Sequence, residues 1–203
     1  MLELPEAIQQ AEPTQQAALH LGFLSRIEQK KGLELLFDAL AEVSFSFKLS
    51  IAGTGESGYV EALKQLAIEK GISQFIDWPG WLEGDDKIKL LSGIDALVLT
   101  SHNENFANVV IEALALGTAV LISKQVGLSD FVEEQHLGWT CELSNDAIVS
   151  SLNACYENSS LRKQIKKGAP ALIRQHFSSE KLVPEYIALY QQSIDINAKK
   201  RSG

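Results

Sequence analysis

The strongest constraint on the fold is the alternation of short apolar runs with amphipathic helical patterns. Apolar runs of strand length occupy residues 18–24, 47–52, 74–78, 94–99, 118–123 and, more weakly, 138–143. Helical patterns lie between them at 32–43, 58–70, 84–92, 105–116 and 127–134, and three more follow at 145–156, 159–175 and 178–195. Strands that alternate with helices form βαβ units, so the sequence predicts a doubly wound, Rossmann-like parallel sheet. Because the strands are almost continuously apolar, we expect helices on both faces of this sheet.

The two ends of the chain depart from this pattern. Residues 1–16 contain two prolines and four glutamines without an apolar period, which predicts an interdomain linker or the start of a truncated domain. Residues 17–195 are expected to form the folded domain. Residues 196–203, which include three consecutive basic side chains, are expected to form a flexible basic tail.

Composition excludes several classes of protein. The net charge of −8 argues against sequence-independent binding to nucleic acid, which requires a basic surface. Cys141 and Cys155 have neither the spacing of a zinc site nor the number needed for a disulfide framework, so we expect two buried free thiols. No apolar run approaches the ~20 residues of a membrane span, and no secretory signal is recognisable. These features predict a soluble, cytoplasmic protein.

Candidate binding residues lie in the loops that follow the strands, because parallel sheets bind ligands at the carboxyl ends of their strands. Arg26 and Lys31 flank the first such turn, where two cations can converge on a diphosphate; two solvated charges are the alternative. Gly53, Gly55 and Gly58 have the G-x-G-x-x-G spacing of dinucleotide sites. This fingerprint normally follows the first strand, whereas here it follows the second. An NAD-dependent oxidoreductase is therefore retained only as an alternative.

The richest loop, residues 100–108, leads into a predicted helix. With a helix start near Asn105, the side chains of Asn105, Asn108 and Glu112 share one face. Glu104 then lies about 10–12 Å from Glu112 along the axis, with the free amides of the first turn between them. Glu104 could then accept from sugar hydroxyls, the amides could bind a diphosphate, and Glu112 could accept from ribose hydroxyls. The alternative role for Glu104 is that of an acid that only complements the helix dipole. Glu112 is followed by apolar residues in a helix that packs on the sheet, so its charge requires a specific partner.

The pattern Glu104-x7-Glu112 within ENFANVVIEALALGTAV resembles the EX7E motif of retaining glycosyltransferases with the GT-B fold, the family 4 or group 1 enzymes. The segments LSRIEQKKGLELL, LSIAGTGE, WPGWLEGDDKIKLLSGIDALVLTS and VGLSDFVEE extend the resemblance from about Ala18 to Tyr190. The set is specific, although each segment alone is not. It covers only the second of the two Rossmann-like halves of such enzymes. The resemblance therefore implies that the N-terminal half, which carries the acceptor site, is missing.

By this resemblance, the loops form the binding site for a nucleotide-sugar donor. Arg26 and Lys31 are implied to bind the diphosphate and to stabilise the charge of the leaving nucleotide, and Glu104 to bind the donor sugar. These three residues form the implied catalytic set. Glu112 is implied to hold the ribose hydroxyls. The remaining implied donor-binding residues are Gly53, Gly55, Trp81, Leu82, Phe106, Ala107, Asn108 and Val109.

Three positions depart from the family pattern, and none of them removes a charge. Ala107 and Ser25 stand where the family has glycine, and Ala119 stands where it has proline. The expected function is binding of a UDP-sugar or GDP-sugar for retaining hexosyl transfer to a glycan or lipid-linked acceptor, without a cofactor or obligatory metal. The isolated chain is expected to be inactive without the N-terminal domain, and peripheral membrane association of the full enzyme is compatible with the resemblance. The alternative is a stand-alone sugar-nucleotide-binding module.

Overall fold

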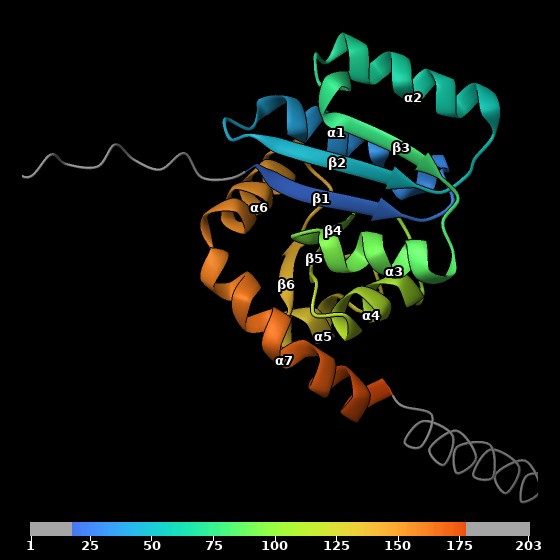
Figure 1. Cartoon of the computed structure of the whole chain (residues 1–203). Helices are drawn as coiled ribbons and strands as arrows, with labels where there is room; N and C mark the ends of the chain where they lie inside the picture. Colours follow the sequence, from blue (N-terminus) through green and yellow to red (C-terminus); the bar gives the residue numbers. More distant parts are fainter. Residues whose placement is uncertain (1–17, 178–203) are drawn as a thin grey trace, which may run out of the picture.

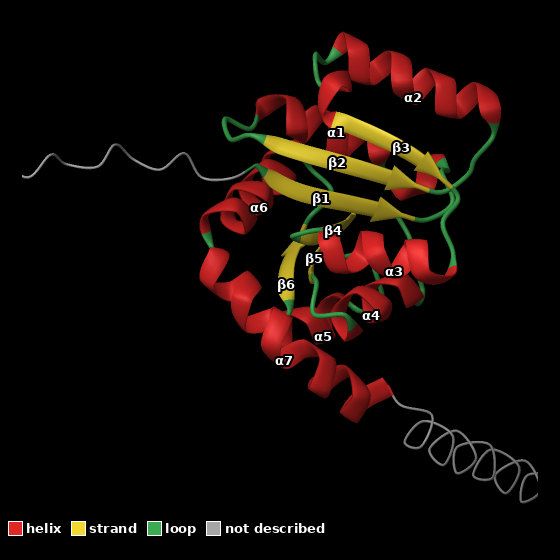
Figure 2. Cartoon of the chain, viewed as in Figure 1, coloured by secondary structure: helices red, strands yellow, loops and turns green. Residues whose placement is uncertain are grey.

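The computed structural model describes residues 18–177; the expected linker at 1–16, the helix expected at 178–195 and the basic tail lie outside the described residues. Six parallel strands form one sheet in the order β3-β2-β1-β4-β5-β6 (Figures 1 and 2). The strands are β1 (Leu19–Leu24), β2 (Phe47–Ala52), β3 (Ile76–Gly80), β4 (Ala96–Leu99), β5 (Ala119–Ser123) and β6 (Gly138–Cys141). The strand order reverses beside β1, as in doubly wound nucleotide-binding sheets. The predicted fold class is therefore confirmed.

Seven α-helices and two short 3-10 turns accompany these strands in the described part, and the last two helices follow β6. They are η1 (Gln29–Lys31), α1 (Leu33–Glu42), α2 (Ser57–Glu69), η2 (Ser73–Phe75), α3 (Gly84–Gly93), α4 (Asn108–Ala115), α5 (Ser129–Glu134), α6 (Asn145–Glu157) and α7 (Ser159–Phe177). α1 packs with α2 and α6, and α4 packs with α3 and α7. Figure 1 shows α1 behind the central strands and α3 in front of them. Between residues 18 and 177, no helix has both the length and the apolar character that crossing a membrane requires.

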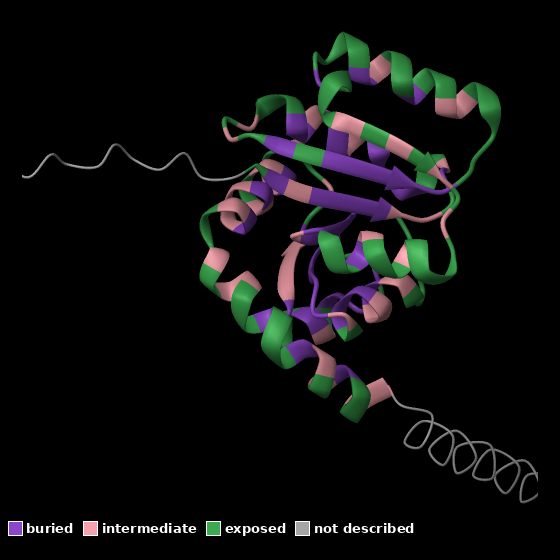
Figure 3. Ribbon diagram, in the orientation of Figure 1, coloured by how far each residue is buried: buried purple, intermediate pink, exposed green. Residues whose placement is uncertain are grey.

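The core lies around the central strands of the sheet. Every residue of β4 and of β5 is buried, as expected for parallel strands with helices on both faces. The edge formed by β2 and β3 differs, because Lys48 and Asp77 are exposed there. Figure 3 shows exposed segments on both of these strands. A hollow of about 570 Å³ opens beside these two residues and His20. At this edge one face of the sheet is open, which the nearly continuous apolar runs did not indicate.

The third strand begins later than the apolar run predicted. The run at 74–78 indicated a strand, but Ser73–Phe75 form a 3-10 turn and β3 begins at Ile76. The ring of Phe75 packs against that of Phe47 with the ring centroids 5.3 Å apart. Phe75 therefore contributes its apolar surface from a turn, and the run does not mark the strand boundary.

Both cysteines are buried free thiols, as predicted. Burial raises the pKa of Cys141 to about 11 and that of Cys155 to about 12. A thiol with a raised pKa carries little thiolate and reacts poorly, so these residues act as small apolar core residues. In the described part of the chain, no three His, Cys, Asp or Glu side chains gather in a group that could hold a metal ion.

Candidate functional site

A hollow of about 350 Å³ opens at the carboxyl ends of β1 and β4, where sheets of this kind bind their ligands. Its walls come from the end of β1, the loop after β1, helix α3 and the segment that follows β4. The lining residues are Leu24, Ser25, Lys31, Lys87, Leu99, Glu104, Phe106, Ala107, Asn108, Val109 and Glu112. The fold therefore brings together most of the site residues that the sequence predicts, including one lysine and both glutamates of the motif.

The backbone around Lys31 is fixed to the loop after β4. Gly32 has a φ of 67°, and a Cβ added there would lie 2.1 Å from the carbonyl oxygen of Thr100. Glycine is required for so close an approach in this conformation. The hydroxyl of Thr100 donates to the carbonyl of Gly32 at 2.9 Å, and the amide of His102 donates to the carbonyl of Lys30 at 2.8 Å. Contacts on both sides of Lys31 thus hold its backbone in place.

Glu104 lies in a loop that is hydrogen-bonded to the loop after β5. The amide of Glu104 donates to the carbonyl of Gln125 at 3.2 Å, and the amide of Gly127 donates to the carbonyl of Glu104 at 2.8 Å. A Cβ on Gly127 would lie 2.2 Å from the carbonyl oxygen of Asn105, so the two loops touch backbone to backbone. These long-range contacts keep Glu104 and Asn105 out of the helix.

Helix α4 begins at Asn108, three residues after the predicted start near Asn105. The predicted common face of Asn105, Asn108 and Glu112 is therefore wrong, although Asn108 and Glu112 still share a face and both line the hollow. The first amides of a helix have no partner within it, so the positive end of α4 lies at the hollow. Ala107 precedes the helix with a φ of −85°, which any residue can adopt. Alanine at this position therefore causes no backbone strain.

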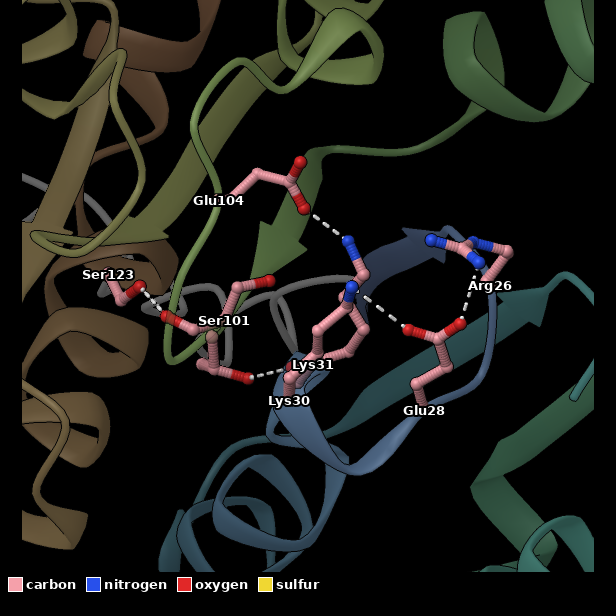
Figure 4. Close-up of polar contacts among 8 residues, drawn as sticks. Arg26, Glu28, Lys30, Lys31, Ser101, Glu104 and Ser123 are labelled. Carbon is pink, nitrogen blue, oxygen red and sulfur yellow. Dashed lines mark hydrogen bonds and ion pairs between the residues drawn. The ribbon is translucent and has the colours of Figure 1, made fainter.

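Two lysine–glutamate pairs line the hollow. Lys31 donates to Glu104, and their side chains are 8% and 22% exposed (Figure 4). Lys87, on α3, lies with its Nζ 2.7 Å from each carboxylate oxygen of Glu112. Each carboxylate of the motif is therefore neutralised by a lysine. Lys87 was not among the predicted site residues. It lies in the charged segment GDDKIK, which has no feature of a binding site, and only the fold places it at the hollow.

Arg26 lies on the same loop as Lys31 but lines a different hollow. Its side chain is 66% exposed, and its Nη1 lies 2.9 Å from Glu28 Oε1 (Figure 4). Lys30 Nζ lies 3.2 Å from the other oxygen of Glu28. The hydrogen bond from Lys30, with the nearby charge of Arg26, holds the pKa of Glu28 below its ordinary value. The hollow beside Arg26, of about 450 Å³, also contacts Gly55.

The first two glycines of the G-x-G-x-x-G loop pack against the loop after β1. A Cβ on Gly53 would lie 1.8 Å from the carbonyl oxygen of Ser25, and one on Gly55 would lie 2.2 Å from that of Ile27. Both glycines also line a hollow of about 390 Å³. Contact between two backbones therefore accounts for these glycines without a ligand.

The N-terminus of α2, where a dinucleotide pyrophosphate would bind, is occupied by Glu56. The carboxylate of Glu56 accepts hydrogen bonds from the amides of Gly58 at 2.9 Å and Tyr59 at 2.8 Å. These bonds lower the pKa of Glu56. An ionised carboxylate at these amides would exclude a pyrophosphate, which argues against NAD at this loop.

Trp81 and Leu82 lie on the loop between β3 and α3 and do not line the hollow with Glu112. The side chain of Trp81 is exposed, and its indole N–H donates to Glu83 Oε2 at 3.4 Å. Their predicted place beside the nucleotide base stays a prediction. The same holds for the ligand contacts assigned to the other site residues.

Comparison with known proteins gives a consistent result. The family described as "Glycosyl transferases group 1" matches residues 6–171. Glycosyltransferase MJ1607 of Methanocaldococcus jannaschii is 26% identical over 177 residues, or 86% of this chain and 45% of that protein. The lipopolysaccharide core biosynthesis glycosyltransferase LpsE of Rhizobium meliloti is 27% identical over 168 residues, or 82% of this chain and 48% of LpsE. Anabaena HepE, solved in complex with UDP-glucose, is 26% identical with a TM-score of 0.76, over 87% of this chain and 49% of HepE. The chain therefore spans about half the length of these relatives.

Proposed function

Because the chain belongs to the group 1 glycosyltransferases, we propose that it is the donor-binding half of a retaining GT-B enzyme. In this proposal the enzyme is of the family 4 type, with Glu104 and Glu112 as its EX7E pair, and transfers a hexose from a nucleoside diphosphate to a glycan or lipid-linked acceptor. The observation that carries the proposal is the hollow in which Lys31, both glutamates and the N-terminus of α4 meet. The complex of HepE with UDP-glucose supports UDP as the first nucleotide to test, with GDP as the second.

The pairing of Lys31 with Glu104 suggests how the donor enters. Sugar hydroxyls would donate to Glu104, and Lys31 would then turn from that carboxylate to the donor diphosphate. The exchange leaves neither charged group unpaired, which matters because the side chain of Lys31 is only 8% exposed. Arg26 would supply a second cation by turning away from Glu28; its side chain is 66% exposed, so solvent would compensate the broken pair.

The proposed transfer breaks the bond between the sugar and the phosphate oxygen and forms a bond to the acceptor oxygen on the same face of the sugar. The proton of the acceptor hydroxyl goes to the leaving phosphate, so no nucleophile of the protein is assigned. Lys31, Arg26 and the amides of α4 stabilise the charge on the departing diphosphate, and the proposal includes no metal or other cofactor. The acceptor would be bound by an N-terminal half like that of the relatives.

Thermal unfolding of the 203-residue chain with UDP, GDP, ADP or NAD tests the proposal. A ligand at about 100 times its dissociation constant adds about 2.7 kcal/mol of stability, which raises the melting temperature by roughly 5–11 °C for a domain of this size. We expect this rise with one nucleoside diphosphate, and its loss in Glu112→Ala. Glu134→Ala, which removes an exposed acid on α5, is the matched control. A rise with NAD alone would contradict the proposal.

Binding without transfer would also be the behaviour of a stand-alone sugar-nucleotide-binding module. Release of UDP from UDP-glucose is therefore measured in the presence of an N-terminal half from a relative such as HepE. Transfer that appears only when both parts are present favours the enzyme. Nucleotide binding that never leads to transfer favours the module.

A further inference from the structure

Lys87 holds the carboxylate that the proposed function assigns to the ribose. Its Nζ lies 2.7 Å from both Oε1 and Oε2 of Glu112, and the two side chains are 29% and 39% exposed. The pair joins α3 to α4 across 25 positions of the sequence, and both residues line the hollow. Lys89, two residues further along α3, instead pairs locally with Asp86 at 2.9 Å, and both are more than two-thirds exposed. Only the first of these pairs lies at the site.

The chemistry of the pair leaves room for a ligand. A carboxylate offers about four acceptor positions on its two oxygens; Lys87 donates to Oε1 and lies equally close to Oε2, so it takes up one side of the group. One position therefore remains on each oxygen of Glu112, which matches the two neighbouring hydroxyls of a ribose. Because Lys87 contacts both oxygens, it also fixes the rotation of the carboxylate group.

We propose that Lys87 is a positioning residue that orients Glu112 toward the 2′ and 3′ hydroxyls of the ribose and so makes the site select ribonucleotides. The inference rests on the proposed function, because it requires the ribose of the donor to lie at Glu112. It adds to that function a determinant of specificity outside the Glu104–Glu112 motif.

A lysine at the hollow could instead attract the diphosphate by its charge alone. The two roles predict that Lys87 affects the affinity for different ligands. Orientation of Glu112 matters only for a ligand that has ribose hydroxyls, whereas attraction by charge matters for every nucleoside diphosphate. An analogue that lacks both hydroxyls but keeps the diphosphate therefore separates them.

The experiment is calorimetric titration of the 203-residue chain and two variants. UDP, GDP and ADP are compared first, and the nucleotide that binds most tightly is then compared with its 2′,3′-dideoxy analogue. Lys87→Met keeps the aliphatic stem and removes the cation, and Lys89→Met is the matched control on the same helix. We expect Lys87→Met to weaken the nucleoside diphosphate about tenfold, as for loss of a charged hydrogen-bond network, and the dideoxy analogue by less than about twofold. Lys89→Met should change neither.

Each other outcome is decisive. Equal weakening of the nucleotide and its dideoxy analogue would assign Lys87 to the diphosphate and overturn the positioning role, as would an unchanged affinity for the nucleotide. If the unaltered chain binds none of the three nucleotides, the proposed function fails and the inference with it. Lys87→Arg, which keeps a cation opposite Glu112, should retain most of the affinity even if Lys87→Met does not fold. A loss in Lys87→Arg that is equal for both ligands would also overturn the inference.

Discussion

The Lys31–Glu104 pair allows a quantitative test of the energetics of the site. Its side chains are 8% and 22% exposed, so removal of one partner leaves a poorly solvated charge. Breaking a fully buried pair costs about 3–5 kcal/mol, and breaking an exposed pair costs about 0.2–1 kcal/mol. The exposure of these side chains lies between the two cases. We therefore expect each single substitution to lower the free energy of unfolding by about 1–3 kcal/mol.

The two single variants should not be equal. Glu104→Gln leaves the ammonium of Lys31 in the more buried position, whereas Lys31→Met leaves a carboxylate that water reaches more easily. Glu104→Gln should therefore be the more destabilising. The double variant removes both charges, so its loss should fall short of the sum of the single losses by about 1–2 kcal/mol.

The assay is urea unfolding of the ligand-free chain, followed by circular dichroism, for all four members of the cycle. The control cycle uses Lys89→Met and Asp86→Asn, whose side chains are 74% and 70% exposed, and its expected coupling is below about 0.5 kcal/mol. Thermal unfolding gives a second measure, at about 2–4 °C per kcal/mol. A coupling at Lys31 and Glu104 no larger than that of the control would refute the argument from burial.

Two further predictions concern residues outside the hollow. Gly55→Ala should lower the free energy of unfolding by at least about 2 kcal/mol in urea, because its Cβ would meet the carbonyl oxygen of Ile27 at 2.2 Å. Gly58→Ala should cost less than about 1 kcal/mol, because its Cβ would meet only the side-chain carboxylate of Glu56, at 3.2 Å. Equal effects would contradict the packing argument. Burial lowers the pKa of His20, so the folded state binds this proton less readily than the unfolded state, and stability should fall as the pH drops below about 6.5 toward the lower folded pKa. Melting temperatures between about pH 7 and 5 should show a smaller slope in His20→Gln than in the control His136→Gln, and identical slopes would count against this role of His20.

The sequence was sufficient for the sheet because burial and local pattern agree there. β4 and β5 are short, fully buried and apolar, so their identity as central strands follows from composition and length. The helices between successive strands then require parallel pairing with right-handed crossovers. β3 was placed less well, since Phe75 belongs to the same apolar run but packs from a turn. The side chain of Phe75 is 41% exposed and packs on Phe47 from the turn, so an apolar residue of the run need not belong to the strand.

The start of α4 could not be predicted, because distant residues set it. Locally, the segment after Glu104 continues into a strong apolar helical pattern, and nothing in it requires a break before Asn108. The break comes from the backbone hydrogen bonds of Glu104 with Gln125 and Gly127, about twenty positions away. They keep Glu104 in the loop and displace Asn105 from the helix face. The structure places the two carboxylates in one hollow, but the spacing did not predict the geometry between them.

Lys87 could not be read from the spacing of the two glutamates, because its place at the hollow depends on the packing of α3 against α4. Its Nζ lies 2.7 Å from both carboxylate oxygens of Glu112, so a residue on a second helix restrains the carboxylate that the proposed function assigns to the ribose. Glu104 is paired with Lys31 in the same way, from the loop after β1. Each of the two carboxylates therefore depends on a lysine that lies far from it in the sequence. For Glu112, α3 supplies that lysine, from a charged segment that has no feature of a binding site.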